Sequence, residues 1–329
     1  MWYDINMKKI LILDTGGTIS QERGSEGALV PGIADIIEIV PRLSEIADIS
    51  YKLITRVDST NMTQDIRVAI TKEIESRHMD FDGFVITHGT DTMVDTACAL
   101  NYMIQDLGKP IVLTGAQLPM FAPGPDGLNN LYYSVKTATD DIGEVVICFG
   151  DRILRGNRSI KENVHGFNAF NSPRTPFIGN LGIDVKLNEN RIKRFNGIPK
   201  FFTNYNSGIA VYTQVSGGTT DILKYYANEP SVTGVIIQGF GTGNTQHRLI
   251  KDIKKIIDCG KPIVIITICL EGNTILGQYQ TGLLAEKSGA LPGKDLSIHA
   301  ATQKMIYALG RNPKDFNKYF YQEIGRDMI

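Results

Sequence analysis

The stretch "KKILILDTGGTISQERGSEG", residues 8–27, decides the fold class of this chain. A continuous run of branched aliphatic residues, Ile10–Leu13, stops at Asp14 and is followed by small hydroxyl and glycine residues. Uninterrupted aliphatic runs are typical of parallel strands that helices cover on both faces, whereas half-exposed strands alternate apolar and polar residues. The segment therefore predicts a buried parallel strand that ends in a polar loop.

Similar runs alternate with helical patterns through the first half of the chain. Alternation of strands and helices gives a doubly wound sheet through right-handed crossovers. Thr63 is a suitable N-cap because its hydroxyl can accept from a free amide of the first helical turn. The predicted strands are Lys9–Leu13, Tyr51–Val57, Gly83–Thr87, Pro110–Thr114 and Glu144–Phe149, and the predicted helices are Ile33–Ile46, Thr63–Met79, Thr92–Leu107 and Leu128–Asp141.

The composition changes between Ile153 and Phe202, where Asn, Arg and Pro are frequent and long apolar runs are few, which predicts irregular strands and a linker. A second series of elements follows, predicted as strand Gly208–Tyr212, helix Gly218–Ala227, strand Gly234–Gln238, helix Thr245–Cys259 and strand Pro262–Ile268. The fold class is therefore α/β. We expect a larger N-terminal domain with a doubly wound, mainly parallel sheet over residues 1–200, ending in an irregular linker near 190–207. A smaller C-terminal α/β domain then covers 208–329.

The charge balance of 34 basic to 35 acidic residues, without a long charged run, argues against nucleic acid or an anionic membrane surface as a partner. No segment approaches the roughly 20 apolar residues of a membrane helix, and the start of the chain lacks a secretory pattern, which predicts a cytoplasmic protein. The four cysteines form no CxxC pair. We expect free, mostly buried thiols, with Cys98, Cys148 and Cys269 in apolar surroundings, and no zinc site.

Polar residues follow four strands of the first half, as Asp14–Thr18, Asp58–Thr60, His88–Asp91 and Gly115–Gln117. Because the carboxyl ends of parallel strands share one edge of a sheet, these side chains are expected to line one ligand crevice. Taken singly, such residues also make turns and caps, and Asp91 is equally suited to cap the helix predicted from Thr92. The loops "DTGGTIS" and "GFGTGN" lack the glycine spacing and the lysine of phosphate-binding loops.

A threonine hydroxyl in this crevice is a weak nucleophile unless a neighbour accepts its proton. Asp91 is a candidate acceptor, and a lysine between the two groups would relay the proton. The chain has no G-x-S-x-G nucleophile elbow. His88, at an apolar strand end, is interpreted as structural.

"TGGTIS", "ITHGTDTM" and "IVLTGAQLP" resemble the bacterial-type L-asparaginases in order and spacing, and the first two resemble the two active-site signatures of that family. "RGNRSIKENVHGFNAFNSP" resembles the segment that carries the catalytic lysine of the family, here Lys161, so the resemblance covers essentially the whole chain. The "VDSTNMT" and "RGNR" segments, with no secretory signal, are similar to the type I, cytoplasmic branch.

The resemblance implies that Thr18 is the nucleophile and attacks the side-chain amide, giving an acyl-threonine and ammonia. It implies that Thr90, Asp91 and Lys161 form a second catalytic group that handles protons for Thr90 or for the attacking water. No metal or organic cofactor is implied.

The resemblance also implies the substrate-binding residues. Asp58 and Ser59, with Thr60 close by, would hold the α-amino and α-carboxylate groups, Asp91 would also meet the ammonium, and the backbone amides near Gly89 and Ala116 would donate to the oxyanion.

One position departs from the family pattern. Alignment on Pro31 puts Leu29 where family members usually carry a tyrosine that approaches the nucleophile. Either another group activates Thr18, or Lys161 and Asp91 suffice, which is our hypothesis. The polar segment Gln21–Pro31 has the composition of a lid, and equally that of an ordinary surface loop.

In the C-terminal domain, Asn244, Thr267 and Cys269 follow strands in the same way, and in some type I enzymes the matching place holds an effector asparagine between subunits. The alternative interpretation is that this crevice completes the active site of a neighbouring subunit.

The predicted function is hydrolysis of L-asparagine to L-aspartate and ammonia by a homodimer or homotetramer. An asparaginase-like subunit of a tRNA amidotransferase is an alternative, although such subunits usually carry an extra N-terminal domain and only thirteen residues precede Asp14 here. A glutaminase-asparaginase is another alternative, because one methylene gives only about 1–3 kcal/mol of discrimination. A non-catalytic amino-acid sensor is disfavoured, since a pure binder has no need of Thr18, Thr90, Asp91 and Lys161 together.

Overall fold

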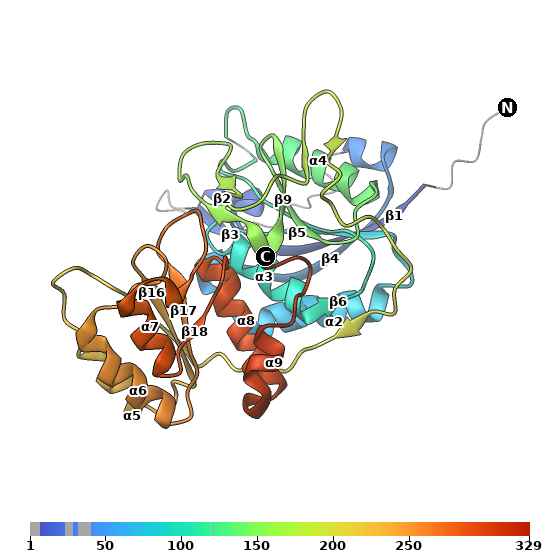
Figure 1. Cartoon of the computed structure of the whole chain (residues 1–329). Coiled ribbons are helices and arrows are strands. Elements are labelled where there is room, and N and C mark those ends of the chain that lie inside the picture. The colour runs from blue at the N-terminus through green and yellow to red at the C-terminus, as the bar shows by residue number, and fades with distance from the viewer. Residues whose placement is uncertain (1–6, 24–28, 32–40, 121) are drawn as a thin grey trace. The chain divides into compact units, whose positions relative to one another are not determined.

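The computed structural model describes residues 7–23, 29–31, 41–120 and 122–329. The chain divides into two compact units, unit 1 ending at Thr203 and unit 2 running from Asn204 to Ile329. Figure 1 shows strands and helices in both units, with unit 2 in yellow to red. The predicted α/β class is confirmed.

The main sheet of unit 1 has the strand order β13-β12-β9-β8-β7-β5-β1-β4. Strands β4, β1, β5, β7 and β8 run parallel, and β9, β12 and β13 continue the sheet antiparallel. The sheet is therefore mainly parallel, as predicted. Its strands are β1 Lys9–Gly16, β4 Asp48–Val57, β5 Gly83–Thr87, β7 Ile111–Thr114, β8 Val145–Phe149, β9 Arg152–Arg155, β12 Gly179–Asn180 and β13 Lys186–Leu187.

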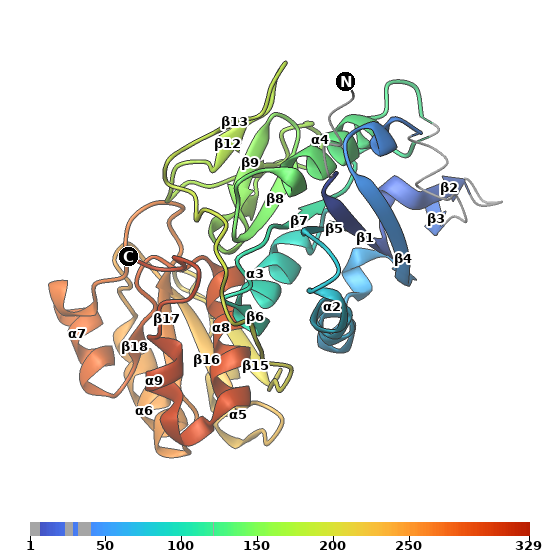
Figure 2. The same cartoon turned by 90° about the vertical axis from the view of Figure 1, so that its right-hand side faces the viewer.

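Helices cover both faces of this sheet, which explains why its central strands are continuous aliphatic runs. Figure 2 shows α4 (Gly127–Thr139) on one side, and α2 (Gln64–Arg77) and α3 (Met93–Met103) on the other. Ile10, Val85 and Val112 are fully buried and belong to one apolar cluster with Leu131 and Val135 of α4. Burial of each such side chain contributes about 1.5–3 kcal/mol relative to exposure.

The strand order reverses at β1, because the chain adds β4 on one side of it and then β5 on the other. Ligands of open α/β sheets bind outside the carboxyl ends of the strands at such a point. The loops that follow β1, β4 and β5 carry three of the four predicted polar segments, and the loop after the adjacent β7 carries the fourth.

Thr63 is the N-cap of α2, and its Oγ1 accepts from the amide of Ile66 at 3.3 Å, which confirms the predicted cap. The helix predicted to extend to Leu107 ends at Met103, because Ile104 is extended and β6 (Ile104–Gln105) pairs with β14 (Lys200–Phe201). Most of the helix predicted over Ile33–Ile46 lies outside the described residues, and its end is the 3-10 helix η2 (Pro41–Glu45).

The region predicted as irregular contains short strands and turns. A buried ion pair anchors it, since Arg155 Nε donates to Glu144 Oε2 at 2.5 Å with both side chains at most 5% exposed. Glu144 Oε1 also accepts from the amide of Ile192 at 2.6 Å, so this carboxylate fastens the segment near 190 to the start of β8.

Unit 2 has a parallel sheet in the order β15-β16-β17-β18. Helices α5, α6 and α7 contribute to one apolar cluster with β16 and β17, while α8 contacts β15, β16 and β17 outside that cluster (Figure 1). The elements are β15 Ile209–Thr213, α5 Ile222–Asn228, β16 Gly234–Gly239, α6 Ile250–Asp258, β17 Ile263–Thr267, α7 Gln280–Lys287, β18 Leu291–Pro292, α8 Ile298–Arg311 and α9 Phe316–Phe320.

Two predicted helices of unit 2 begin too early. Helix α5 starts at Ile222 rather than at Gly218, and α6 starts at Ile250, after a 3-10 turn over His247–Leu249. Glycine and polar residues at the starts of both segments favour turns over helix.

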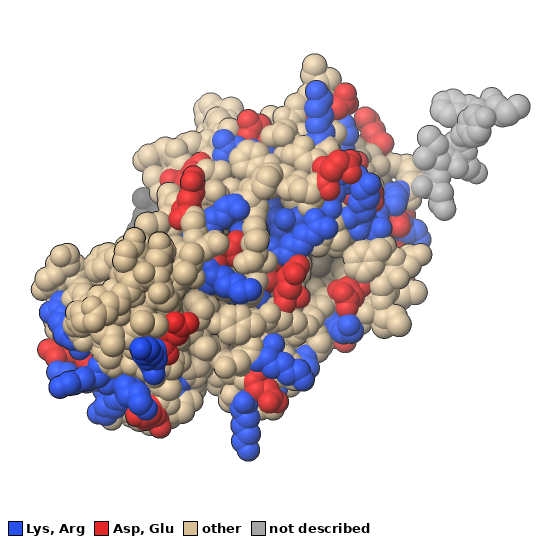
Figure 3. Space-filling model, viewed as in Figure 1, with Lys and Arg blue, Asp and Glu red and all other residues tan. Residues whose placement is uncertain are grey.

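On the face shown in Figure 3, basic and acidic side chains lie beside one another. In the described part of the chain, no helix is long and apolar enough to cross a membrane. All four cysteines are free, and Cys98 and Cys148 are buried as expected. The expectation for Cys269 was wrong, since this residue is exposed and lies beyond the end of strand β17. Cys259, the C-cap of α6, is exposed as well.

Candidate active site

The first loop of the site contains two glycines in the left-handed region, with φ of +92° at Gly16 and +86° at Gly17. A Cβ at Gly17 would lie 2.3 Å from the amide nitrogen of Gly89, so only glycine permits this approach of the two loops. Thr18 begins the 3-10 helix η1 (Thr18–Ser20) and is half-buried. The loop that carries Thr18 therefore packs against the loop that leads into Thr90.

The buried carboxylate of Asp14 holds this first loop in place through hydrogen bonds. Asp14 is 1% exposed, and its Oδ1 accepts from the amide of Gly16 at 2.9 Å and from Thr87 Oγ1 at 2.6 Å. Its Oδ2 accepts from Tyr51 Oη at 2.8 Å. The sequence suggested that Asp14 lines the crevice, and the structure instead buries it in a network that joins β1, β4 and β5.

The second cluster is formed by Thr90, Asp91 and Lys161. Lys161 Nζ donates to Thr90 Oγ1 at 2.8 Å and to Asp91 Oδ1 at 2.6 Å. Thr90 is buried, while the side chains of Lys161 and Asp91 are 17% and 55% exposed. The structure thus brings together three residues that lie up to 71 positions apart.

Asp91 does not cap α3, because the N-cap is Thr92. The hydroxyl of Thr92 donates to the carbonyl of Ser59 at 2.7 Å instead, which ties the start of α3 to the loop after β4. The carboxylate of Asp91 is therefore available to accept the hydrogen bond from Lys161.

The loop after β4 carries Asp58, Ser59 and Thr60 on a 3-10 turn over Ser59–Asn61. Asp58 Oδ1 accepts from the amide of Thr60 at 2.8 Å and from its hydroxyl at 2.7 Å. The hydrogen bond from the amide of Thr60, and then that from its hydroxyl, hold the pKa of Asp58 below its ordinary value, so this exposed carboxyl stays charged. Ser59 is buried, and a Cβ at Gly89 would lie 2.6 Å from its Oγ.

The loop after β7 is fixed by a residue that the sequence did not single out. The carboxylate of Asp126 accepts from the amide of Gln117 at 2.9 Å and from that of Leu118 at 2.9 Å. Ala116, just before them, is 1% exposed and adjoins Gly127 at the start of α4. The Gln117 side chain donates to the carbonyl of Gly166 at 3.1 Å, which connects this loop to the segment that carries Lys161.

Lys161 itself lies in the short strand β10 (Ile160–Lys161), which pairs antiparallel with β11 (Phe170–Asn171). This hairpin is separate from the main sheet. Of the predicted lid, strands β2 (Gln21–Arg23) and β3 (Leu29–Pro31) pair antiparallel, residues 24–28 lie outside the described residues, and so does the side chain of Leu29.

The predicted residues of unit 2 lie at the carboxyl ends of β16 and β17. Asn244 Oδ1 accepts from Thr281 Oγ1 at 3.0 Å, and the buried Thr267 accepts from the amide of Cys269 at 3.0 Å. The hydroxyls of Thr242 and Thr274, from the same edge of the sheet, are buried and have no hydrogen-bond partner among the described residues.

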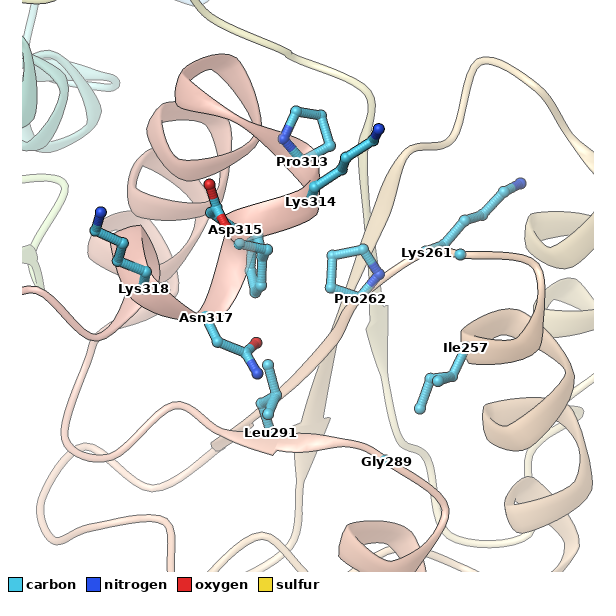
Figure 4. Close-up of a pocket in the computed structure, with 12 residues that line it drawn as sticks. Ile257, Lys261, Pro262, Gly289, Leu291, Pro313, Lys314, Asp315, Asn317 and Lys318 are labelled. Atoms are coloured by element: carbon cyan, nitrogen blue, oxygen red, sulfur yellow. The ribbon is translucent and has the colours of Figure 1, made fainter.

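Unit 2 also has a surface pocket of about 470 Å³ at the opposite, amino edge of its sheet (Figure 4). Pro262, Leu291 and Asn317 line it, together with three lysines, of which Lys261 donates to the carbonyls of Tyr226 and Glu229. Because none of the predicted site residues lines this pocket, it is not the candidate active site. Within the described residues, no cluster of three His, Cys, Asp or Glu residues could hold a metal ion.

Comparison with known proteins identifies the scaffold. The family described as "Asparaginase, N-terminal" matches residues 9–193, and the family described as "Glutaminase/Asparaginase C-terminal domain" matches residues 208–320. The chain belongs to the asparaginase family. It is therefore an amidohydrolase of the class that the sequence resemblance indicated.

Individual asparaginases agree with this assignment. The chain is 32% identical over 313 residues to L-asparaginase 1 of Escherichia coli (strain K12), with 92% of each protein covered. The crystal structure of L-asparaginase I from Vibrio cholerae superposes with a TM-score of 0.87 at 30% identity, covering 98% of this chain and 99% of that one. The similarity to the type I branch is thus confirmed.

The scaffold is shared with other activities. The chain is 29% identical over 319 residues to one component of the glutamyl-tRNA(Gln) amidotransferase of Pyrococcus horikoshii, covering 93% of this chain but 73% of that component. The asparaginases named above match along nearly their whole length, so the asparaginase interpretation fits better.

Proposed function

We propose that this asparaginase-family protein hydrolyses L-asparagine to L-aspartate and ammonia through an ester at Thr18. The observation that supports it most is the hydrogen bonding of Lys161 to both Thr90 and Asp91, at 2.8 and 2.6 Å. Thr90 and Asp91 follow β5, next to the loop of Thr18.

In the first step, Thr18 Oγ attacks the side-chain amide carbon, the C–N bond breaks, and ammonia leaves with the two amide hydrogens and the proton of the Thr18 hydroxyl, which the site relays. In the second step, a water molecule attacks the ester carbon, the ester C–O bond breaks, one water proton goes to Thr18 Oγ, and the remaining hydroxyl stays on the aspartate product. The Lys161 ammonium, held by the Asp91 carboxylate, polarises Thr90 and relays protons for these steps. Backbone amides near Gly89 and Ala116 would stabilise the oxyanion, each by about 3–4 kcal/mol.

The loop of Asp58, Ser59 and Thr60 is proposed to bind the amino-acid end of the substrate. The lowered pKa of Asp58 supports this role, because a carboxylate that stays ionised attracts the α-ammonium group. Asp91, more than half exposed, would contribute to the same ammonium site.

We further propose a cytoplasmic homodimer or homotetramer that acts in asparagine breakdown. The four free thiols support a reducing compartment, since oxidising compartments favour disulfides. Closed two-fold symmetry is the general expectation for soluble oligomers.

A second proposal concerns unit 2, where Asn244, Thr267 and Cys269 would bind an effector asparagine or complete a site between subunits. Thr242 and Thr274, whose buried hydroxyls have no hydrogen-bond partner in the part of the chain that the structure describes, support a ligand at this edge. Sigmoidal asparagine kinetics that Thr267→Ala makes hyperbolic would support regulation, and hyperbolic kinetics of the wild type would exclude it.

The main proposal is tested by ammonia release from asparagine and, separately, from glutamine. Thr18→Val should abolish release while circular dichroism shows an intact fold, whereas Thr18→Ser should keep a measurable rate. Mass spectrometry of a quenched reaction should find the acyl adduct on the peptide that contains Thr18. Binding of asparagine without turnover would favour the sensor, and ammonia release with glutamine alone would favour a glutaminase.

A further inference from the structure

The imidazole of His88 is fully buried, and both of its ring nitrogens have partners. Nδ1 lies 2.7 Å from the carbonyl oxygen of Gly89, and Nε2 lies 2.9 Å from Thr96 Oγ1. A carbonyl oxygen can only accept, so the hydrogen is on Nδ1. The uncharged ring must then accept at Nε2 from the hydroxyl of Thr96. Burial lowers the pKa of His88 to about 4, which agrees with an uncharged ring.

A charged residue fixes the direction of the Thr96 hydroxyl. Arg67 Nε donates to Thr96 Oγ1 at 3.2 Å, and Arg67 also donates to Gln64 Oε1 at 2.6 Å. Because the guanidinium occupies a lone pair of the Thr96 oxygen, the hydroxyl proton is directed to His88 Nε2. A buried chain of donors thus runs from Arg67 on α2, through Thr96 on α3, to the ring that follows β5.

The carbonyl that His88 holds belongs to the peptide that joins Gly89 to Thr90. In a trans peptide the carbonyl and the amide hydrogen point in opposite directions, so holding the Gly89 oxygen also sets the direction of the Thr90 amide. Two loops lie against Gly89. A Cβ added to Gly17 would lie 2.3 Å from the amide nitrogen of Gly89, and a Cβ added to Gly89 would lie 2.6 Å from Ser59 Oγ. A small displacement of Gly89 would therefore disturb both neighbouring loops.

We infer that His88 is a positioning residue, whose Nδ1–H tautomer is set by the Gly89 carbonyl and completed at Nε2 by Thr96 and Arg67, and that it orients the Gly89–Thr90 peptide relative to Thr18. The inference rests on the proposed function for its catalytic part. His88 does not touch the reacting atoms. It acts by holding the backbone amide and the hydroxyl of Thr90 in a fixed orientation relative to the loop that carries Thr18.

Two substitutions of His88 separate positioning from simple packing. Asn puts an amide NH2 where Nδ1 lies, and Gln puts it where Nε2 lies, so His88→Asn can still donate to Gly89 and His88→Gln cannot. We expect His88→Gln to lower kcat for asparagine by about 10- to 100-fold, the loss typical of misplaced catalytic groups, with KM nearly unchanged. His88→Asn should stay within about threefold of the wild type, because it keeps the hydrogen bond. Equal rates for the two folded variants would overturn the inference.

Thr96 supplies a second pair in case the His88 variants fail to fold. Thr96→Val has the same shape but no hydroxyl, and Thr96→Ser keeps the hydroxyl. Nitrogen-15 NMR of labelled histidine should show a single Nδ1–H tautomer for His88 in the wild type and in Thr96→Ser. In Thr96→Val the Gly89 carbonyl still holds the hydrogen on Nδ1, but the Nε2 resonance should shift because its hydrogen bond is lost, together with a lower kcat. Thr96→Val with an unchanged Nε2 resonance and an unchanged kcat would overturn the inference.

The NMR measurement does not depend on activity, so the two proposals can fail separately. An Nε2–H or doubly protonated ring in the wild type at neutral pH would overturn the assignment of His88, whatever the rate. The expected tautomer in a protein that releases no ammonia would instead refute the proposed function, and with it the catalytic part of the inference.

Discussion

Replacement of Lys161 by Met tests the proposed second catalytic group, Thr90, Asp91 and Lys161, most directly. The substitution keeps most of the side-chain length but removes the donor to Thr90 at 2.8 Å and to Asp91 at 2.6 Å. General acid–base groups contribute about 10²- to 10⁴-fold in rate, equivalent to about 3–5 kcal/mol at the transition state. The ion pair itself adds at most about 1 kcal/mol to stability, because the carboxylate of Asp91 is more than half exposed. We therefore expect a large loss of kcat with little loss of stability.

The assay is steady-state ammonia release, with the urea midpoint measured on the same samples. Lys200→Met is a matched control, since Lys200 Nζ pairs with Asp106 Oδ2 at 2.7 Å and both side chains are at least half exposed. It should change stability by a similar amount and leave kcat alone. Lys161→Arg keeps the charge but cannot give up a proton at ordinary pH, so it should also lose at least about 10²-fold. Full activity in Lys161→Arg would show that the lysine acts only through its positive charge and transfers no proton. Activity of Lys161→Met within tenfold of the wild type would refute the mechanism.

Three further outcomes are expected. Asp14→Asn should lower the free energy of unfolding by about 1–3 kcal/mol, because the new amide group points a donor at groups that also donate. Tyr51→Phe removes one hydrogen bond and should lower it by only about 0.5–1.5 kcal/mol. Urea titrations that rank the two variants in the opposite order would contradict the network. Burial lowers the pKa of His88 to about 4, so between pH 6.5 and pH 4 the unfolded chain binds a proton that the folded chain excludes, and stability falls as pH falls through this window by up to about 3 kcal/mol. His88→Asn should remove that part of the slope, and a wild-type slope identical to that of the variant would exclude it. Gly17→Ala should abolish turnover, since its Cβ would lie 2.3 Å from the amide nitrogen of Gly89 and its φ is positive; a variant with normal kcat and normal stability would show that the loop can relax.

The parallel strands could be predicted from the sequence because burial on both faces leaves a continuous aliphatic pattern. The carboxyl-edge loops followed from topology alone, since parallel strands place their ends together. The positions and pairing of strands such as β6, β9 and β12 were not predicted, because two to four residues carry too little periodicity and their pairing depends on partners distant in the chain. The end of α3 at Met103 was missed for the same reason, because β6 pairs with β14 almost a hundred residues later.

Within the site, residue types could be predicted better than their hydrogen-bond partners. Asp14 and Asp58 look alike in the sequence, each at the end of a strand, yet one is buried under three donors and the other is exposed. Asp126 gave no signal, because its role is to accept from the amides of Gln117 and Leu118 across a turn. His88 was expected to be structural. Its burial agrees with that, but the direction of its two hydrogen bonds depends on Arg67 and Thr96, which no local pattern connects to it.

The hairpin that carries Lys161 has a consequence for biosynthesis. The loops of Thr18 and Thr90 belong to neighbouring strands, β1 and β5, whereas Lys161 comes from a hairpin outside the main sheet, 71 positions after Thr90. During synthesis, the loops of Thr18 and Thr90 therefore leave the ribosome before Lys161 does. The proposed site needs this hairpin as well as the main sheet. Ammonia release during refolding should therefore recover later than the strands form, and the delay would measure how long the hairpin takes to fold and pack.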